Sequence, residues 1–281
     1  ETLMKYPAGK TATSYTIPST VKKLGNFSFD RVSYLTSITM PEGLTSIDTG
    51  VFYKATALTS VNIPEGVKYI GESAFKDASA LTSVSIPSTV TTIGNKAFAY
   101  TTSLTSINIP SSVTKIGYYA FLEATALTSI VVPQGVTSIN EGTFAYATAL
   151  TSVTIPDSVT LIDYFAFEGS TALESINIPA SVKTLNDWAF WGATSLKDVY
   201  FLGNAPDYIG DDVFYKIAAG AKAHITAKAT GFGTEPTWNG LTVERATDTP
   251  AVPENGFYDC ATGVKLAESE GKRYSIYNLS L

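Results

Sequence analysis

Apolar and polar positions alternate in a seven-residue segment that recurs every 23 residues along most of the chain. In one copy, Val84 and Ile86 fall on the same side of an extended chain. Ser83 and Ser85 fall on the opposite side, which predicts a half-buried strand. Pro87 ends the strand, because proline has no N–H for a ladder and fixes its own φ. The same corner recurs at Pro18, Pro41, Pro64, Pro87, Pro110, Pro133, Pro156 and Pro179.

A fixed period of this length predicts a solenoid in which each repeat forms one rung. After the proline corner, a second apolar pair such as Val90 and Ile93 is followed by a position that holds only Gly, Asn or Asp. Its occupants are Gly25, Asp48, Gly71, Gly94, Gly117, Asn140, Asp163 and Asn186. These residue types adopt left-handed backbone at the least cost, so we expect a positive φ at this position.

Phenylalanine recurs in phase later in each repeat, usually after a small residue. The series is Phe29, Phe52, Phe75, Phe98, Phe121, Phe144, Phe167 and Phe190. Large rings at one period are predicted to stack as a spine through the convex side of the solenoid. One rung buries too little apolar surface to fold alone, so each rung depends on its neighbours.

The repeat predicts four parts along the chain. Residues 1–14 are expected to form an N-terminal cap, and residues 15–215 a solenoid of about nine rungs, the ninth irregular. Residues 216–246 lose the period but keep apolar alternation, which indicates a C-terminal cap. Residues 247–281 are expected to form a linker and a small C-terminal extension.

The repeat Leu-Thr-Ser-Ile-x-Ile-Pro-x-x-Val-x-x-Ile-Gly-x-x-Ala-Phe, as in residues 104–121, resembles the BspA-like class of bacterial leucine-rich repeats. The resemblance covers about residues 15–215, and residues 203–206 resemble that family's end rung. It implies an α/β-type leucine-rich-repeat solenoid that is β-rich. The implied coil is right-handed, with a concave parallel sheet and an irregular or 3₁₀ convex side.

The resemblance also implies a role. Members of this class resemble secreted or surface-anchored bacterial proteins that adhere to host proteins or to other cells, and no catalytic residues come with the family. We therefore expect a non-catalytic extracellular binding module whose partner is a host or bacterial protein, or a glycan. The alternative is a structural spacer within a larger surface protein. We expect secretion or cell-surface display, with a signal peptide already removed.

Composition and charge limit the classes of partner that the chain could bind. The chain is 44% hydrophobic and 16% charged, and no run is apolar and long enough to span a membrane. Residues 1–140 carry 10 Lys and Arg against 8 Asp and Glu, whereas residues 141–281 carry 9 against 17. This acidic second half disfavours nucleic acid as a partner. The sequence assigns no oligomeric state.

Two sets of residues are candidate binding sites. The first points outward from the predicted concave strands: Ser60, Asn62, Ser83, Ser85, Ser106, Asn108, Ser129, Val131, Ser152, Thr154, Ser175, Asn177, Asp198 and Tyr200. The second is an aromatic flank toward the C-terminal rungs: Tyr118, Tyr119, Tyr164, Phe165, Trp188, Trp191, Tyr208 and Tyr215. Tyr and Trp suit sugar stacking or protein contact. The alternatives are a solvated polar ladder for the first set and cover for the end rungs for the second.

Catalysis, metals and cofactors have little support. The single cysteine, Cys260, excludes an intramolecular disulfide framework and a cysteine-rich zinc site. A calcium site from Asp207, Asp211 and Asp212 lacks the Asp-x-Asp-x-Asp-Gly loop. His224 has no nearby partner apparent from the sequence, so a structural role is expected. Glycoside hydrolysis by two carboxylates is formally open, but we expect neither enzyme activity, nor a metal, nor a cofactor.

Overall fold

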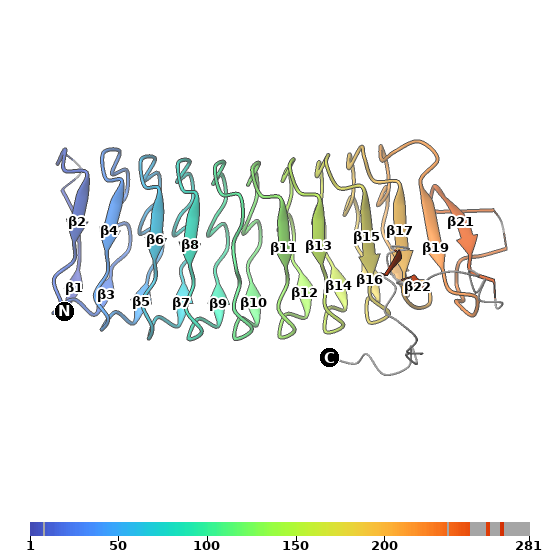
Figure 1. Cartoon of the computed structure of the whole chain (residues 1–281), viewed down its shortest axis with the longest axis horizontal. Coiled ribbons are helices and arrows are strands. Elements are labelled where there is room, and N and C mark those ends of the chain that lie inside the picture. The colour runs from blue at the N-terminus through green and yellow to red at the C-terminus, as the bar shows by residue number, and fades with distance from the viewer. Residues whose placement is uncertain (8, 235, 248–256, 259–264, 267–281) are drawn as a thin grey trace.

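The computed structural model describes residues 1–7, 9–234, 236–247, 257–258 and 265–266. The described residues up to 247 form one row of stacked rungs, with the N-terminus at one end (Figure 1). Most rungs contribute one longer and one shorter strand, joined by turns, and the described part of the chain contains no helix. Accordingly, none of its elements is a helix long and apolar enough to cross a bilayer.

The longer strands lie side by side in parallel. They are β2 (Ser14–Thr16), β4 (Ser37–Thr39), β6 (Ser60–Asn62), β8 (Ser83–Ser85), β11 (Ser129–Val131), β13 (Ser152–Thr154), β15 (Ser175–Ile178), β17 (Asp198–Phe201), β19 (Lys222–Ile225) and β21 (Leu241–Arg245). They form the sheets β2-β4-β6-β8, β11-β13 and β15-β17-β19-β21, the last edged by antiparallel β20 (Thr237–Trp238). We call the solvent side of these strands the strand face.

The shorter strands form a second set of parallel ladders. They are β1 (Thr2–Leu3), β3 (Lys23–Leu24), β5 (Ser46–Ile47), β7 (Tyr69–Ile70), β9 (Thr92–Ile93), β10 (Lys115–Ile116), β12 (Ser138–Ile139), β14 (Leu161–Ile162), β16 (Thr184–Leu185) and β18 (Tyr208–Ile209). Outside the stack, β22 (Phe257–Tyr258) pairs antiparallel with β23 (Lys265–Leu266).

The predicted fold class, a β-rich leucine-rich-repeat solenoid with parallel sheets, is confirmed. The register advances by one repeat, since Ser60 lies opposite Ser83 and Ile47 opposite Ile70. The stack has about eleven turns rather than nine, because β19 and β21 extend the parallel sheet within residues 216–246. The division of the chain into four parts remains a prediction.

The phenylalanine spine is present. Neighbouring rings from Phe29 to Phe190 stack with centroids 5.1 to 5.6 Å apart, and Phe214 continues the row. Every ring from Phe29 to Phe190 is fully buried. Each phenylalanine therefore contacts its equivalents in the rungs before and after it, which couples the rungs through the core.

The expected positive φ at the Gly, Asn or Asp position is wrong. None of these residues has a positive φ, which occurs instead two residues later, as at Ser73 and Lys96, and again four residues after that. There the convex backbone donates hydrogen bonds to the next rung, as from Ser73 N to Asn95 O. Ladder geometry, rather than residue preference, sets the left-handed positions.

Close approach of neighbouring backbones, rather than a positive φ, explains glycine at this position. A Cβ added to Gly71 would lie 2.5 Å from the carbonyl carbon of Asp48, so the backbones of these two rungs approach too closely for a side chain at position 71. Where the position holds Asn140, the side chain takes part in the ladder. Its Nδ2 donates to Ile116 O at 2.5 Å, at the point where β10 and β12 do not pair.

Candidate binding surfaces

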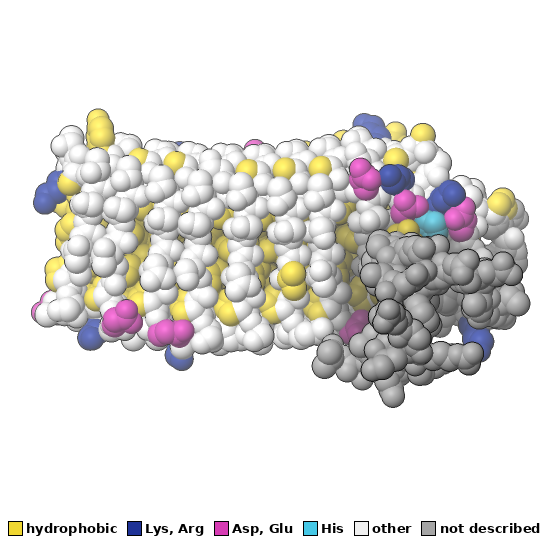
Figure 2. Space-filling view, in the orientation of Figure 1, with side chains coloured by type: hydrophobic (Ala, Val, Ile, Leu, Met, Phe, Trp, Pro, Cys, Tyr) yellow, Lys and Arg dark blue, Asp and Glu magenta, His cyan; other side chains and the backbone are white. Residues whose placement is uncertain are grey.

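The strand face carries the first candidate set where the sequence placed it. From Ser60 to Ser175 these side chains are exposed, whereas Asn177, Asp198 and Tyr200 are half-buried. Alongside them runs a row of threonines whose hydroxyls bond to backbone oxygens one rung earlier, as from Thr82 Oγ1 to Thr59 O at 3.0 Å. The centre of this face is largely uncharged, and charged side chains gather at its C-terminal end (Figure 2).

At that end, β17, β19 and β21 bring together side chains that are distant in the sequence. Tyr200 lies opposite His224, and His224 opposite Glu244. His224 Nε2 is 2.7 Å from Asp198 Oδ1, and its Nδ1 is 3.4 Å from Glu244 Oε2. The Tyr200 ring stacks on the imidazole with centroids 4.4 Å apart. We call these four residues the end cluster.

Sequence reasoning missed the partners of His224. They lie 26 and 20 residues away, so the regular 23-residue step does not align them. The sequence predicts a cap over residues 216–246, where the 23-residue period is lost, and so gives no register for the strands β19 and β21. Both ring nitrogens face carboxylates, so the protonated imidazole can donate to each of them. The arrangement ties the last strands together, as expected of a structural histidine.

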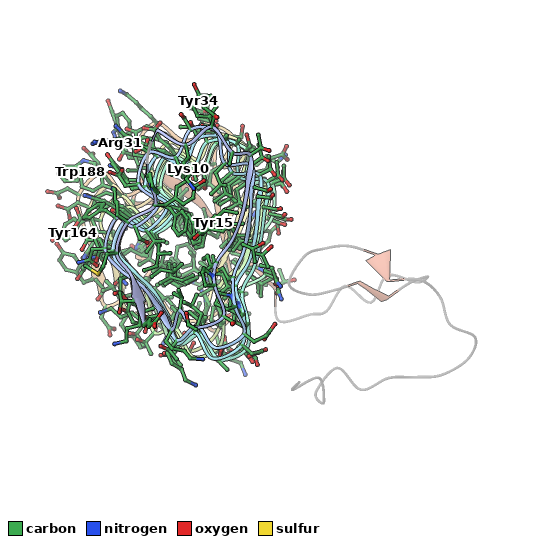
Figure 3. All side chains as sticks on the ribbon, turned by 90° about the vertical axis from the view of Figure 1, so that its left-hand side faces the viewer. Lys10, Tyr15, Arg31, Tyr34, Tyr164 and Trp188 are labelled. Atoms are coloured by element: carbon green, nitrogen blue, oxygen red, sulfur yellow. The ribbon has the colours of Figure 1, made fainter. Side chains whose placement is uncertain are left out.

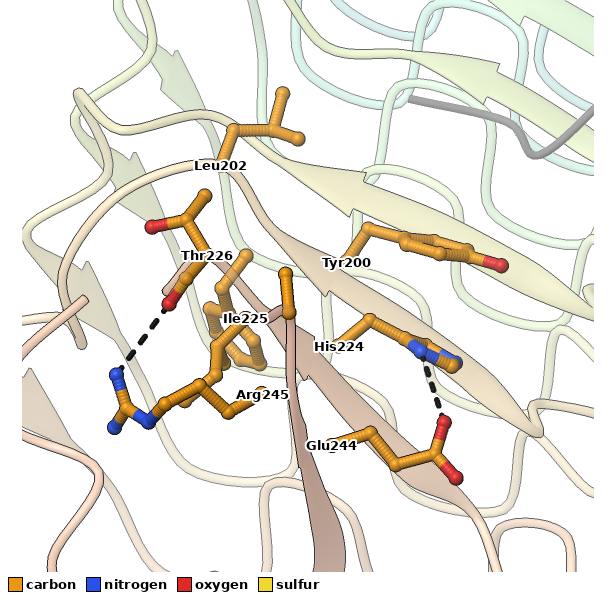
Figure 4. A pocket seen from close by; sticks show the side chains of 9 residues that line it. Tyr200, Leu202, His224, Ile225, Thr226, Glu244 and Arg245 are labelled. Carbon is orange, nitrogen blue, oxygen red and sulfur yellow. Dashed lines mark hydrogen bonds and ion pairs between the residues drawn. The ribbon is translucent and has the colours of Figure 1, made fainter. Parts of the chain in front are cut away.

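A shallow pocket of about 290 Å³ adjoins the end cluster (Figure 4). Its lining comprises Tyr200, Phe201, Leu202, His224, Ile225, Thr226, Glu244, Arg245 and Ala246. Arg245 Nη1 donates to Ala229 O at 2.6 Å, so its guanidinium anchors the preceding loop. The Tyr200–His224–Glu244 side offers aromatic and polar groups to a ligand, whereas the Arg245 side holds the scaffold together.

The aromatic flank lies on the convex side. Six of its eight members lie between residues 164 and 215, and Figure 3 shows Tyr164 and Trp188 projecting from the same side of the stack. Phe165 stacks on Trp188 with centroids 5.1 Å apart. The ammonium of Lys216 lies 4.7 Å from the Trp191 ring centroid. The structure brings these six together, while Tyr118 and Tyr119 lie earlier along the same side.

Tyr146 belongs with the convex aromatics but was absent from the sequence prediction. Its ring lies over Gly169, where an added Cβ would be 2.6 Å from the ring. Tyr119 lies over Gly142 in the same way, and a Cβ added to that glycine would be 2.2 Å from the ring. An aromatic residue followed 23 positions later by glycine is the sequence signal that could have identified both.

The hydroxyls of these two tyrosines donate to carboxylates. Burial raises the pKa of Tyr119 to about 12, and the hydrogen bond and charge of Glu141 act in the same direction. The hydrogen bond to Glu168 raises the pKa of Tyr146 to about 12, with burial second. The unfolded chain titrates near 10. Their contribution to stability is therefore complete below about pH 10 and is lost as the pH rises through about 12.

Removing the Glu168 carboxylate tests this assignment. Glu168→Gln is expected to bring the Tyr146 pKa back toward its ordinary value, because the largest cause of the shift is gone. Ultraviolet titration of tyrosinate, with the Tyr146→Phe variant subtracted, isolates this hydroxyl. Glu174→Gln, which removes a strand-face carboxylate paired with Lys197, should leave the titration unchanged. A Tyr146 titration that is identical in the wild type and Glu168→Gln contradicts the assignment.

The structure offers no support for a calcium site at Asp207, Asp211 and Asp212. Across the part of the chain that it describes, no group of three or more His, Cys, Asp and Glu side chains is arranged to hold a metal ion. Asp207, Asp211 and Asp212 are exposed and belong to no such group.

Comparisons with known proteins give the family. A model described as a BspA type leucine rich repeat region, in six copies, matches residues 8–128 and 114–236. Among solved structures, a leucine-rich repeat protein of T. pallidum has a TM-score of 0.55 and 24% identity, covering 57% of this chain and 77% of that one.

Two further structures are less similar. The pneumococcal vaccine antigen PcpA has a TM-score of 0.43 and 20% identity, covering 84% of this chain and 74% of that one. A leucine rich cell surface protein from Faecalibacterium prausnitzii has a TM-score of 0.38 and 22% identity, covering 84% and 83%. A comparison with curated proteins found no match. Because the family model spans most of the stack, the chain belongs to the BspA-type leucine-rich repeat family.

Proposed function

We propose that this chain is a non-catalytic binding module of a bacterial surface protein, and that it contacts its partner through its C-terminal rungs. One observation carries the proposal: large aromatic and charged side chains gather around β15 to β19, whereas the rest of the strand face is a row of small polar residues. Leucine-rich-repeat solenoids generally serve as scaffolds for protein interaction.

The chemistry at this end suits recognition of a protein. Interface hot spots are enriched in Tyr, Trp and Arg, and they lie in pockets that exclude water. Tyr200 borders the 290 Å³ pocket on the strand face, and Trp188 is half-buried on the convex side. Both rings are already held by stacking, Tyr200 on His224 and Trp188 on Phe165, so little side-chain entropy is lost on binding.

The biological setting follows from the family resemblance. We place the module outside the cell, on a secreted or surface-anchored protein, and assign it adhesion to a host or bacterial protein or to a glycan. The stack supports this setting because its stability comes from packed rungs and a buried ring spine. Such a fold needs neither disulfides nor a metal to persist outside the cell.

A structural spacer is the second candidate. The threonine row of the central rungs favours it, because these hydroxyls bond to the neighbouring rung instead of remaining free for a ligand, as Thr59 Oγ1 does with Thr36 O at 3.1 Å. A spacer would hold another domain away from the cell wall. It requires no recognition chemistry at the C-terminal end.

Binding to a panel of matrix proteins, bacterial surface proteins and glycans separates the two. For a binder, Tyr200→Ala or Trp188→Ala should weaken the detected interaction by about tenfold or more, the effect of losing one hot spot. Tyr34→Ala is the matched control, since Tyr34 is 53% exposed on an early rung. Melting curves show whether each variant stays folded. No interaction across the panel, or equal loss in Tyr34→Ala, contradicts the proposal.

A further inference from the structure

One row on the convex side holds two aromatic rings, with one carboxylate between them and two carboxylates after the second ring. Tyr118, Glu141, Tyr164, Asp187 and Asp211 occupy the same position in successive rungs, so they follow one another along the stack. Tyr118 is 46% exposed and Tyr164 40% exposed. We call these five residues the convex row. Neighbouring rungs of a parallel sheet lie about 4.8 Å apart, so the two tyrosines are about 10 Å apart along the stack.

Other tyrosines on the same side show what such rings bind. The ammonium of Lys76 lies 5.6 Å from the Tyr53 centroid and 5.4 Å from that of Tyr100. Lys96 lies 5.7 Å from the centroid of Tyr119. In each case a lysine on a neighbouring rung places its charge over a tyrosine ring, which is a cation–π contact.

Tyr118, Tyr164 and Tyr208 differ from these rings. Among the residues that the structure describes, no Lys or Arg lies over Tyr118, Tyr164 or Tyr208. The convex turns of these rungs carry seven carboxylates, at Glu123, Glu141, Asp163, Glu168, Asp187, Asp211 and Asp212. Their one basic residue is Lys216, which is engaged with Trp191 and Tyr215.

Carboxylates beside the row act electrostatically on a neighbouring tyrosine. Tyr208, which begins β18 beside the row, is 51% exposed. The charge of Asp187 is the largest cause of the raised pKa of the Tyr208 hydroxyl, and Tyr164 and Asp211 also raise it. A cation placed over these rings would therefore also be attracted by the carboxylates beside them.

We propose that the convex row binds an extended, basic segment of a partner polypeptide, whose lysine or arginine side chains lie over the faces of the tyrosine rings. The spacing suits a polyproline II segment with a cationic residue at every third position. Such a segment advances about 9.3 Å per three residues, against about 10 Å between Tyr118 and Tyr164. This inference rests on the proposed function and names the chemistry of its partner.

The probe is a fluorescent peptide of four Lys-Pro-Pro repeats, titrated with the full chain by anisotropy at low and high salt. We expect saturable binding that salt weakens. A peptide with acetylated lysines, which keeps the shape but loses the charge, should not bind. A peptide of the same composition with its lysines in one block should bind more weakly, because it cannot match the rung spacing.

Variants of the convex row test the geometry. Tyr164→Ala should lower the affinity by about two- to fivefold, the value of one exposed cation–π contact. Asp187→Asn keeps the oxygen that accepts from Asp211 N and removes only the charge, so it too should weaken binding. Tyr34→Ala, on an early rung, should have no effect.

A lysine supplied within the row should displace the peptide. Glu141→Lys places an ammonium between Tyr118 and Tyr164, as Lys76 lies between Tyr53 and Tyr100. It should reduce binding well beyond Glu141→Gln, which keeps an acceptor for the Tyr119 hydroxyl. Equal binding of the spaced and blocked peptides, or of Tyr164→Ala and Tyr34→Ala, overturns the inference. If a panel partner is found that needs Tyr200 while the peptide does not bind, the proposed function stands and this inference fails.

Discussion

Phe98→Ala is expected to lower the free energy of unfolding by about 3–5 kcal/mol, the usual cost of truncating a buried aromatic ring. Phe98 is fully buried and stacks on Phe75 and Phe121, with centroids 5.2 and 5.5 Å away. The substitution leaves a cavity in the middle of the spine and removes both stacking contacts. In a chain of this size, the midpoint of thermal unfolding should fall by about 10 °C.

Thermal and urea unfolding followed by circular dichroism measure this effect. Tyr34→Ala provides the comparison, because its ring is 53% exposed and outside the spine, and its midpoint should shift little. If Phe98→Ala and the wild type have the same midpoint of unfolding, the spine does not couple the rungs.

The second large effect is expected from Gly71→Ala. The new Cβ would meet the carbonyl carbon and oxygen of Asp48 at 2.5 Å and Ile47 O at 2.9 Å. These are backbone atoms held in the rung-to-rung ladder, so the rungs themselves must separate. Overpacking of this kind costs about 1–3 kcal/mol. The loss should appear as a lower midpoint of unfolding, although alanine normally stabilises a chain relative to glycine.

Gly9→Ala is the matched control, because nothing lies within 4 Å of a Cβ added there. It should leave the midpoint unchanged or raise it slightly. If Gly71→Ala also stabilises the protein, the approach of neighbouring rungs does not explain the glycine at position 71.

The regular part of the fold could be predicted from the sequence because the same constraint acts once per rung. Alternation around Val84, the corner at Pro87 and the ring at Phe98 each specify local geometry, and repetition makes the pattern unmistakable. The exposed Ser and Thr of the strand face follow from the same alternation. So does the gathering of aromatic residues near the C-terminal end, since their phase in the repeat places them on one side.

Features that depend on contact between rungs could not be predicted in this way. The left-handed positions fall at residues as different as Ser73, Lys96 and Trp188, so composition gives no signal. Gly71 is small because of Asp48 one rung earlier, which only the stacked backbone reveals. His224 finds its carboxylates through strand register in rungs whose spacing departs from the period.

The central claim is that positions 23 residues apart occupy equivalent places in successive rungs. Spin labels on cysteines introduced in place of Ser37 and one of Ser129, Ser152 or Ser175, with Cys260→Ser, report this directly, because all four serines are exposed. Pulsed electron–electron double resonance should give distances between the two labels of about 19, 24 and 29 Å, rising by one strand spacing of about 4.8 Å per repeat. Distances that do not grow by a constant step would contradict the stacked solenoid.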